Sequence, residues 1–222
     1  VKEWIADLEQ KTKARLDILT LGKWAGREMG LKSDLDFVFV TGEAPEEKHF
    51  KMARRFINFL HGSASGQTLY QIDLRLRPTG HAGPLLMTLE DLRAYLETKS
   101  KTWERQAYLS NRLLKENQTL RLFSPRPMDV EDKNSLLDIQ NRLLLPIHDK
   151  IDIKKSRGGL IHTEFTLQIS LLRRGLFPTD SSLRGLIEAL GRSDGALCER
   201  LAANYAFLRA HQQLLILLSD SS

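Results

Sequence analysis

Cysteine is almost absent from this chain of 222 residues, since Cys198 is the only one. A lone cysteine cannot form a disulfide within the chain, which excludes the small disulfide-stapled secreted domains and fits the reducing cytosol. The sequence also lacks an apolar run long enough to cross a membrane. The opening stretch VKEWIADLEQ contains no apolar targeting segment. We therefore expect a cytoplasmic protein with no membrane partner.

Two further absences limit the chemistry. The six histidines show no spacing typical of metal ligands. No stripe of basic and aromatic residues indicates a nucleic-acid-binding surface. The formal net charge of +5 and the isoelectric point near 9.3 favour an anionic partner, which covers nucleotide phosphates, nucleic acid and acidic protein surfaces. Charge alone does not distinguish among these partners, so the choice depends on the sequence motifs.

The chain before residue 88 alternates between strand-like and helix-like patterns. The apolar patterns of residues 16–22, 36–40 and 69–76 predict strands. The pattern of residues 44–62 predicts a helix with one apolar stripe, and the N-terminal run has the same helical period. This alternation predicts an α+β unit built on a small sheet.

From residue 88 onward the apolar pattern is helical almost throughout. Thr88 followed by Asp91 is typical of a capped helix start. Apolar residues that recur every third or fourth position predict several further helices, which would form a bundle. Two prolines and a polar flank make residues 122–135 the best linker candidate. We therefore divide the chain into domains 1–121 and 122–222.

Two aspartates stand one residue apart at the start of the apolar run in LKSDLDFVFV, residues 31–40. Because residues i and i+2 of a strand point to the same side, Asp34 and Asp36 should lie side by side at the edge of a sheet. Two carboxylates at such a short distance repel each other unless a proton or a cation lies between them. A solvated turn before the strand is the alternative explanation.

A third aspartate, Asp73, lies in the stretch LYQIDLRLRP, residues 69–78. Alternate residues of this stretch are apolar, and the opposite face carries Asp73, Arg75 and Arg77. A solvated sheet face with internal salt bridges is the alternative explanation. If this strand is a neighbour of the strand that carries the aspartate pair, three carboxylates and several cations share one cleft.

Such a cleft suits phosphoryl or nucleotidyl transfer, which uses divalent metal ions held by oxygen ligands. Guanidinium and lysine side chains would offset the charge of a triphosphate. A glycine turn at Gly22 and Lys23 would let backbone N–H groups approach phosphate oxygens. Ser33 directly precedes the acid pair. Together these residues predict a metal-dependent nucleotide site.

The same stretches resemble a known family. LGKWAGREMGLKSDLDFVFV, LYQIDLRLRPTGHAGPL and WERQAYLSNR are similar to the nucleotidyltransferase domains of the glutamine synthetase adenylyltransferase family. DIKKSRGGLIHTEFTLQ, residues 152–168, resembles the segment that follows in that family. The resemblance implies an α+β fold: a polymerase-β-like nucleotidyltransferase domain with a small mixed sheet, followed by an all-helical bundle domain.

The resemblance also implies roles for individual residues. The catalytic and metal-binding acids of the family fall on Asp34, Asp36 and Asp73, with Mg²⁺ or Mn²⁺ as the ion and ATP as the substrate. The nucleotide-binding positions that it implies in the first domain are Gly22, Lys23, Ser33, Arg75 and Arg77.

In the second domain, Lys154 would reach the nucleotide, and Gly158-Gly159 would allow a close approach of that loop. A salt-bridged turn explains the same residues equally well. His162 stands where the family usually has an acidic residue, so no acid role is expected at that position.

The implied function is transfer of AMP from ATP to a tyrosine of glutamine synthetase. One alternative is phosphorolytic removal of AMP from adenylylated glutamine synthetase. Others are a transferase that acts on a small molecule or RNA, and a non-catalytic regulatory module that retains the fold. The intact acid triad argues against a regulatory module. Glutamine synthetase is the expected partner, and a PII-type signalling protein is a further candidate.

Overall fold

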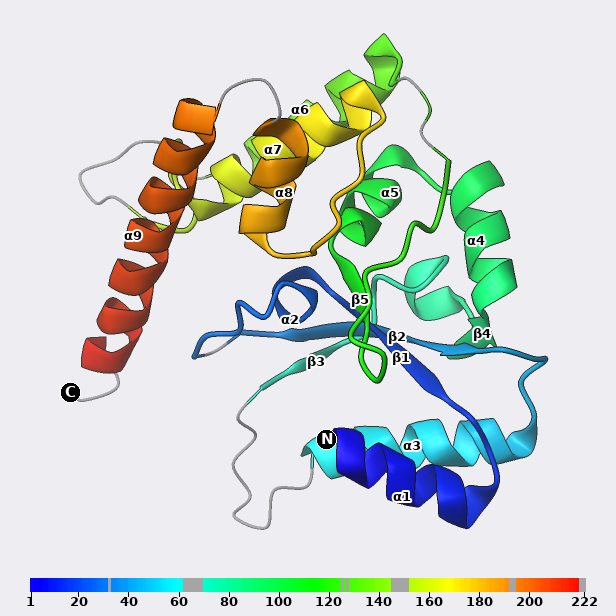
Figure 1. Cartoon of the computed structure of the whole chain (residues 1–222). Coiled ribbons are helices and arrows are strands. Elements are labelled where there is room, and N and C mark those ends of the chain that lie inside the picture. The colour runs from blue at the N-terminus through cyan, green and yellow to red at the C-terminus, as the bar shows by residue number, and fades with distance from the viewer. Residues whose placement is uncertain are drawn as a thin grey trace. The chain divides into compact units, whose positions relative to one another are not determined.

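The computed structural model of the chain forms two compact units, Val1–Phe123 and Ser124–Ser222 (Figure 1). The structure describes residues 1–31, 33–61, 70–124, 126, 128–144, 152–191 and 195–219. The first unit contains a mixed sheet and helices, and the described part of the second unit is helical. The expected α+β class with a small mixed sheet is therefore confirmed.

The sheet of the first unit is built around the strand that follows the aspartate pair. Its strands are β1 (Asp17–Leu21), β2 (Leu35–Thr41), β3 (Ile72–Asp73), β4 (Leu86–Thr88) and β5 (Asn111–Leu113). The order is β3-β2-β1-β5, and β4 also pairs with β2. β1 is antiparallel to β2 and β5, whereas β3 and β4 are parallel to β2. Because β1 occupies one edge of β2, β3 and β4 share its other edge.

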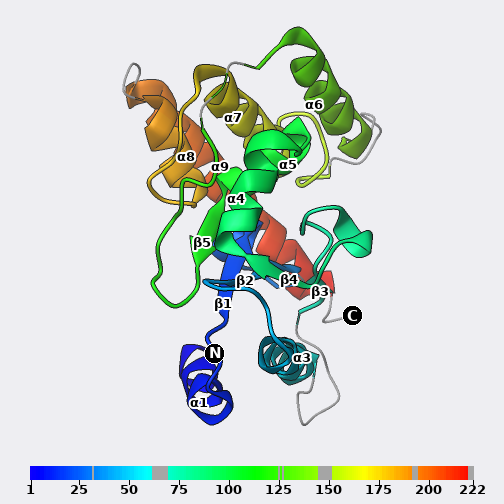
Figure 2. The ribbon, with the colours of Figure 1, turned by 90° about the vertical axis from the view of Figure 1, so that its right-hand side faces the viewer.

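Two helices cover one face of this sheet. α1 (Lys2–Thr12) and α3 (Glu47–His61) lie side by side against it (Figure 1, Figure 2). Phe37 and Phe39 lie two residues apart on β2 and therefore on the same face. Their ring centroids lie 5.7 Å and 5.9 Å from that of Phe56 on α3, and both pairs are nearly edge to face. This arrangement is the favourable one for aromatic pairs. The apolar cluster therefore anchors the start of β2, where the aspartates lie.

The opposite face of the sheet carries α4 (Leu89–Thr98) and α5 (Thr102–Leu109), together with the short α2 (Gly22–Ala25) (Figure 1). The Thr88 hydroxyl accepts a hydrogen bond of 2.9 Å from the backbone N–H of Asp91. The predicted capped start of this helix is confirmed, since the hydroxyl satisfies an N–H group that lacks an intrahelical partner.

The sequence interpretation was wrong about three local features. β5 lies in the part that was predicted to be helical and β4 lies just before it, and neither strand was predicted, because strands of three residues are too short for a period-2 pattern. The predicted strand at 69–76 pairs only over Ile72–Asp73 within the described residues, since the backbone N–H of Arg77 donates to Leu74 O where the chain turns. Gly22 begins α2 and does not end the preceding strand.

The second unit contains α6 (Val130–Leu143), α7 (Leu160–Arg174), α8 (Leu183–Leu190) and α9 (Gly195–Ser219). α7 packs against the other three helices. The linker prediction for 122–135 was too long, because α6 begins at Val130, where Asp129 accepts a hydrogen bond from the N–H of Asp132. Among the described helices, none is both long and apolar enough to span a membrane.

Candidate active site

The pairing of β2 with β3 brings the predicted acids together. Asp36 and Asp73 are register partners in this parallel pair, and the N–H of Leu35 donates to Gln71 O at 2.7 Å. Residues at the same register of neighbouring strands point to the same face of a sheet. Asp34 lies two residues before Asp36, and it lines a pocket together with Asp73. The three carboxylates therefore occupy one edge of the sheet.

Burial and the neighbouring acids change the proton affinity of Asp36. Burial raises the pKa of Asp36 from 3.8 to about 7, with further contributions from the negative charges of Asp73 and Asp34. The positive charges of Lys23 and Arg75 oppose this rise. The ionised form of Asp36 is therefore unfavourable in the chain alone, and a cation beside its carboxylate would favour that form.

The chain passes close to Asp36 at Gly22. This glycine has a left-handed backbone, with φ of 51°, and a Cβ atom at this position would lie 3.3 Å from Asp36 Oδ2. Its N–H donates to Ser110 O at 3.0 Å, which joins the start of α2 to the segment before β5. Glycine suits both requirements, since it tolerates this backbone and leaves room for the carboxylate. The structure thus places the predicted Gly22–Lys23 turn beside Asp36.

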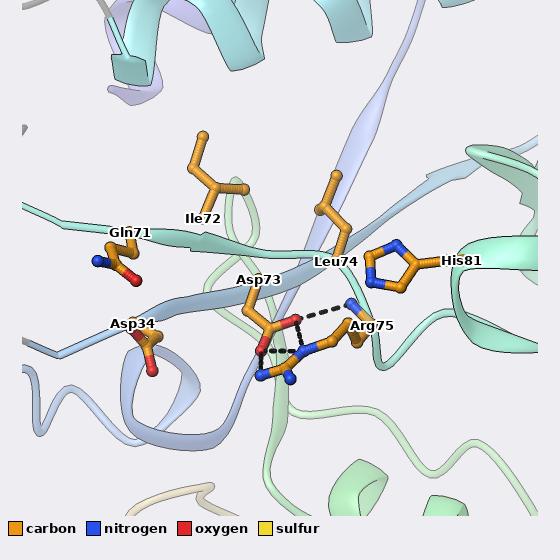
Figure 3. A pocket seen from close by; sticks show the side chains of 7 residues that line it. All are labelled: Asp34, Gln71, Ile72, Asp73, Leu74, Arg75 and His81. Carbon is orange, nitrogen blue, oxygen red and sulfur yellow. Dashed lines mark hydrogen bonds and ion pairs between the residues drawn. The ribbon is translucent and has the colours of Figure 1, made fainter.

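The carboxylate of Asp73 makes hydrogen bonds to Arg75. Arg75 Nε lies 3.0 Å and 2.9 Å from Oδ1 and Oδ2, Nη2 also donates to Oδ2, and the backbone N–H of Arg75 donates to Oδ1 at 2.8 Å (Figure 3). These hydrogen bonds hold the pKa of Asp73 below its usual value. In the part of the chain that the structure describes, no three acidic, histidine or cysteine side chains are already arranged to hold a metal ion.

A pocket of about 350 Å³ opens on this edge of the sheet. It is lined by Asp34, Gln71, Ile72, Asp73, Leu74, Arg75 and His81. Figure 3 shows the side chains of Asp73 and Arg75 on the side of Asp34, and those of Ile72 and Leu74 on the opposite side. Ile72 and Leu74 pack against the apolar core. The two-faced pattern predicted for this stretch is confirmed over residues 72–75.

Gln71 and His81 belong to the pocket but were not among the predicted site residues. Gln71 follows from the same period-2 pattern as Asp73 and Arg75, so the alternation contained the signal for it. His81 lies on the short 3₁₀ helix Gly80–Ala82, beyond the strand. No periodic pattern reaches a residue in such a turn. The sequence indicates only a loop residue near the site, and the structure shows that His81 lines the pocket.

The structure does not bring all predicted nucleotide-binding side chains to the pocket. Arg77 donates hydrogen bonds to the backbone carbonyls of Leu74, His81 and Gly83, and so holds the turn that carries His81. The hydroxyl of Ser33 accepts from the N–H of Gly30 at 3.0 Å, within a local turn.

Lys154 belongs to the second unit, in a turn that is organised by an aspartate. Asp152 Oδ1 accepts from the N–H groups of Lys154 and Lys155, and His162 Nδ1 accepts from the N–H of Gly158. These contacts account for the local fold of the turn. The role of Lys154 at the nucleotide stays a prediction.

A known protein family matches the unit that contains this site. The family model for glutamate-ammonia ligase adenylyltransferase matches residues 2–123, which is more than half of the chain. The chain belongs to this family. The match spans β1 to β5 and all the residues that line the pocket, so the resemblance inferred from the motifs is confirmed.

Members of the glutamate-ammonia ligase adenylyltransferase family match the second unit as well. The relatives are named bifunctional glutamine synthetase adenylyltransferase/adenylyl-removing enzyme. The one from Thioalkalivibrio sulfidiphilus is 30% identical, over 93% of this chain and 24% of its own length. The relative from Corynebacterium efficiens is 28% identical over 90% of this chain and 20% of its own length. The relative from Bordetella pertussis is 31% identical over 89% of this chain and 26% of its own length. The chain therefore spans about a quarter of the length of these curated relatives.

Proposed function

We propose that the first unit is a polymerase-β-like nucleotidyltransferase domain that transfers AMP from ATP to a tyrosine of glutamine synthetase. The observation that carries this proposal is the register pairing of Asp36 with Asp73, with Asp34 beside them and Gly22 against Asp36. Carboxylates grouped beside a glycine turn suit the charge distribution of a metal-bound triphosphate. The names of the relatives support the choice of glutamine synthetase as the acceptor.

The residues of this cluster fit a divalent metal ion by their chemistry. Asp34, Asp36 and Asp73 offer carboxylate oxygens, the ligands that Mg²⁺ and Mn²⁺ prefer. The raised pKa of Asp36 indicates negative charge that a cation would relieve. A bound ion would polarise the phosphate under attack and neutralise charge on the leaving pyrophosphate.

The side chains around the acids would position the two reactants. The Gly22–Lys23 turn would bind the triphosphate with backbone N–H groups and the Lys23 ammonium. Asp73 would accept a hydrogen bond from the tyrosine hydroxyl and orient it toward the α-phosphorus. Arg75 lowers the pKa of Asp73 in the chain alone, and a bound cation in its place would also lower it. Asp73 is therefore a weak base with an orienting role, and the proton of the tyrosine hydroxyl, made more acidic by a bound ion, would pass to water.

The reverse chemistry is a second candidate, because the relatives are named for both transfer and removal. Inorganic phosphate would then attack the tyrosyl-AMP and release ADP. The same acids serve both directions, so they do not distinguish them. A PII-type protein as an effector is a proposal that rests on the family resemblance alone.

The direct test is incubation of the chain with glutamine synthetase, magnesium and labelled ATP. A parallel reaction contains adenylylated glutamine synthetase, magnesium and inorganic phosphate. Label on the protein supports transfer, and release of ADP supports removal. Glu90→Gln, an exposed change on α4, is the matched control and should retain the activity. If neither reaction proceeds, the alternative of a non-catalytic module is favoured.

A further inference from the structure

Arg75 is closely engaged with the acid cluster through Asp73. Its guanidinium and its backbone N–H together make hydrogen bonds to both oxygens of Asp73. The Arg75 side chain is 69% exposed, whereas that of Asp73 is 15% exposed. The pair therefore lies at the pocket wall, with the carboxylate inside and the guanidinium open to solvent.

This geometry matters for any cation that uses Asp73. A carboxylate offers about four lone-pair positions on its two oxygens. Arg75 makes four hydrogen bonds to them, three from its side-chain nitrogens and one from its backbone N–H, with two on each oxygen. A metal ion needs at least one of the same lone pairs at bonding distance, and it would also repel the guanidinium. Arg75 and the metal ion therefore compete for the same carboxylate.

We propose that Arg75 is an internal counter-ion that a divalent metal ion displaces from Asp73, and that the freed guanidinium then binds a phosphate group of the nucleotide. This inference rests on the proposed nucleotidyl transfer. It assigns Arg75 two successive partners, and it makes Arg75 a positioning residue that couples metal binding to nucleotide binding.

The second partner follows from the chemistry of the side chain. The planar guanidinium fork matches two phosphate oxygens as well as it matches a carboxylate. Its exposure leaves it free to turn toward the pocket that Asp34 and Gln71 also line. Because coupling between two ligands is reciprocal, the metal ion and the nucleotide each increase the affinity for the other, in addition to any direct contact between them.

The first arm of the test measures Mn²⁺ binding by electron paramagnetic resonance, without nucleotide, in the full chain. Arg75→Ala should bind Mn²⁺ about fivefold more tightly than the unmodified chain, because the competitor is gone. Arg75→Lys keeps the positive charge but lacks the fork, so its affinity should lie between the two. Arg93→Ala, which removes an exposed arginine of α4, controls for net charge and should change nothing.

The second arm measures binding of a non-hydrolysable ATP analogue at saturating Mn²⁺. Arg75→Ala should bind the analogue about tenfold more weakly, since the phosphate loses its guanidinium partner. Opposite signs in the two arms are the signature of the proposed exchange. A merely structural role for Arg75 would weaken both. Melting temperatures in a chelator check that all variants are folded.

The outcomes separate this inference from the proposed function. If the unmodified chain binds Mn²⁺ and Arg75→Ala binds it no more tightly, Arg75 does not compete and the inference is wrong, while the proposed function stands. If metal binding tightens but the analogue affinity is unchanged, the transfer of Arg75 to phosphate is wrong. If the unmodified chain binds no Mn²⁺, the proposed metal-dependent function fails, and this inference fails with it.

Discussion

Replacement of Asp36 by asparagine should abolish nucleotidyl transfer and stabilise the fold at the same time. Asparagine keeps the size of the side chain and removes its charge. The carboxylate of Asp36 is half-buried on β2, where Asp73 and Asp34 add negative charge. A carboxylate that destabilises the metal-free protein but is needed to hold the metal ion should have opposite effects when it is removed: stability should rise and activity should fall.

The magnitude follows from the pKa of Asp36. A rise from 3.8 to about 7 corresponds to about 4 kcal/mol, at about 1.36 kcal/mol for each pKa unit. The folded state binds the proton more tightly than the unfolded state, so wild-type stability should fall as the pH rises between these two values. Asp36→Asn does not titrate and should escape this loss. The variant should therefore be more stable above about pH 7.5, by up to about 4 kcal/mol.

The assay is urea unfolding of both proteins in a metal chelator, at about pH 4 and at about pH 8. The difference in unfolding free energy should be below about 1 kcal/mol at the lower pH and largest at the higher one. Asp7→Asn, an exposed change on α1, is the control and should show no such dependence. With magnesium and ATP, transfer activity should fall on the order of a thousandfold in Asp36→Asn.

Two results would refute this reasoning. Near-normal activity of Asp36→Asn would remove Asp36 from the mechanism. A loss of stability at about pH 8 would show that the carboxylate supports the fold, in which case the site would have to be built from Asp73.

Three further changes test the structure around the site and beyond it. Gly22→Ala should destabilise the first unit by about 1–2 kcal/mol and lower activity, because of the left-handed backbone and the contact with Asp36. The control Gly42→Ala, where a Cβ atom meets nothing, should be neutral. Equal melting temperatures of the two variants would contradict this prediction. Lys115→Met should cost about 2 kcal/mol in urea unfolding, because it strands two partly buried carboxylates of α1 and β1; an unchanged midpoint would show that this ion pair contributes nothing. Tyr205→Phe should destabilise the second unit by about 1–2 kcal/mol through loss of its hydrogen bond to a glutamate of α7, and an unchanged thermal unfolding curve would contradict that contribution.

Local patterns predicted the parts of the site that lie on one strand. The spacing of Asp34 and Asp36 and the alternation around Asp73 were visible in the sequence because side-chain direction repeats every two residues in a strand. The helix cap at Thr88 was also visible, since capping depends on residues three apart. Such features need only the chemistry of a few neighbouring residues.

Pairing between distant segments was beyond the reach of these patterns. β5 has three residues, and only its pairing with β1 makes it a strand. The turn that carries His81 is held by Arg77 through backbone carbonyls, a contact that the sequence did not indicate. The role of Arg77 at the nucleotide stays a prediction. Arginine suits a phosphate and a cluster of carbonyls equally well, and its sequence position does not distinguish them.

The sequence by itself determined the family, the choice of three candidate acids and the alternation of the strand that carries Asp73. Only the tertiary structure decided that Asp36 and Asp73 are register partners, that Gly22 packs against Asp36, and that Arg75 binds Asp73. The reason is physical. The type of a side chain limits which chemistry it can perform, but its pKa and its partner depend on burial and on charges that arrive from other segments of the chain.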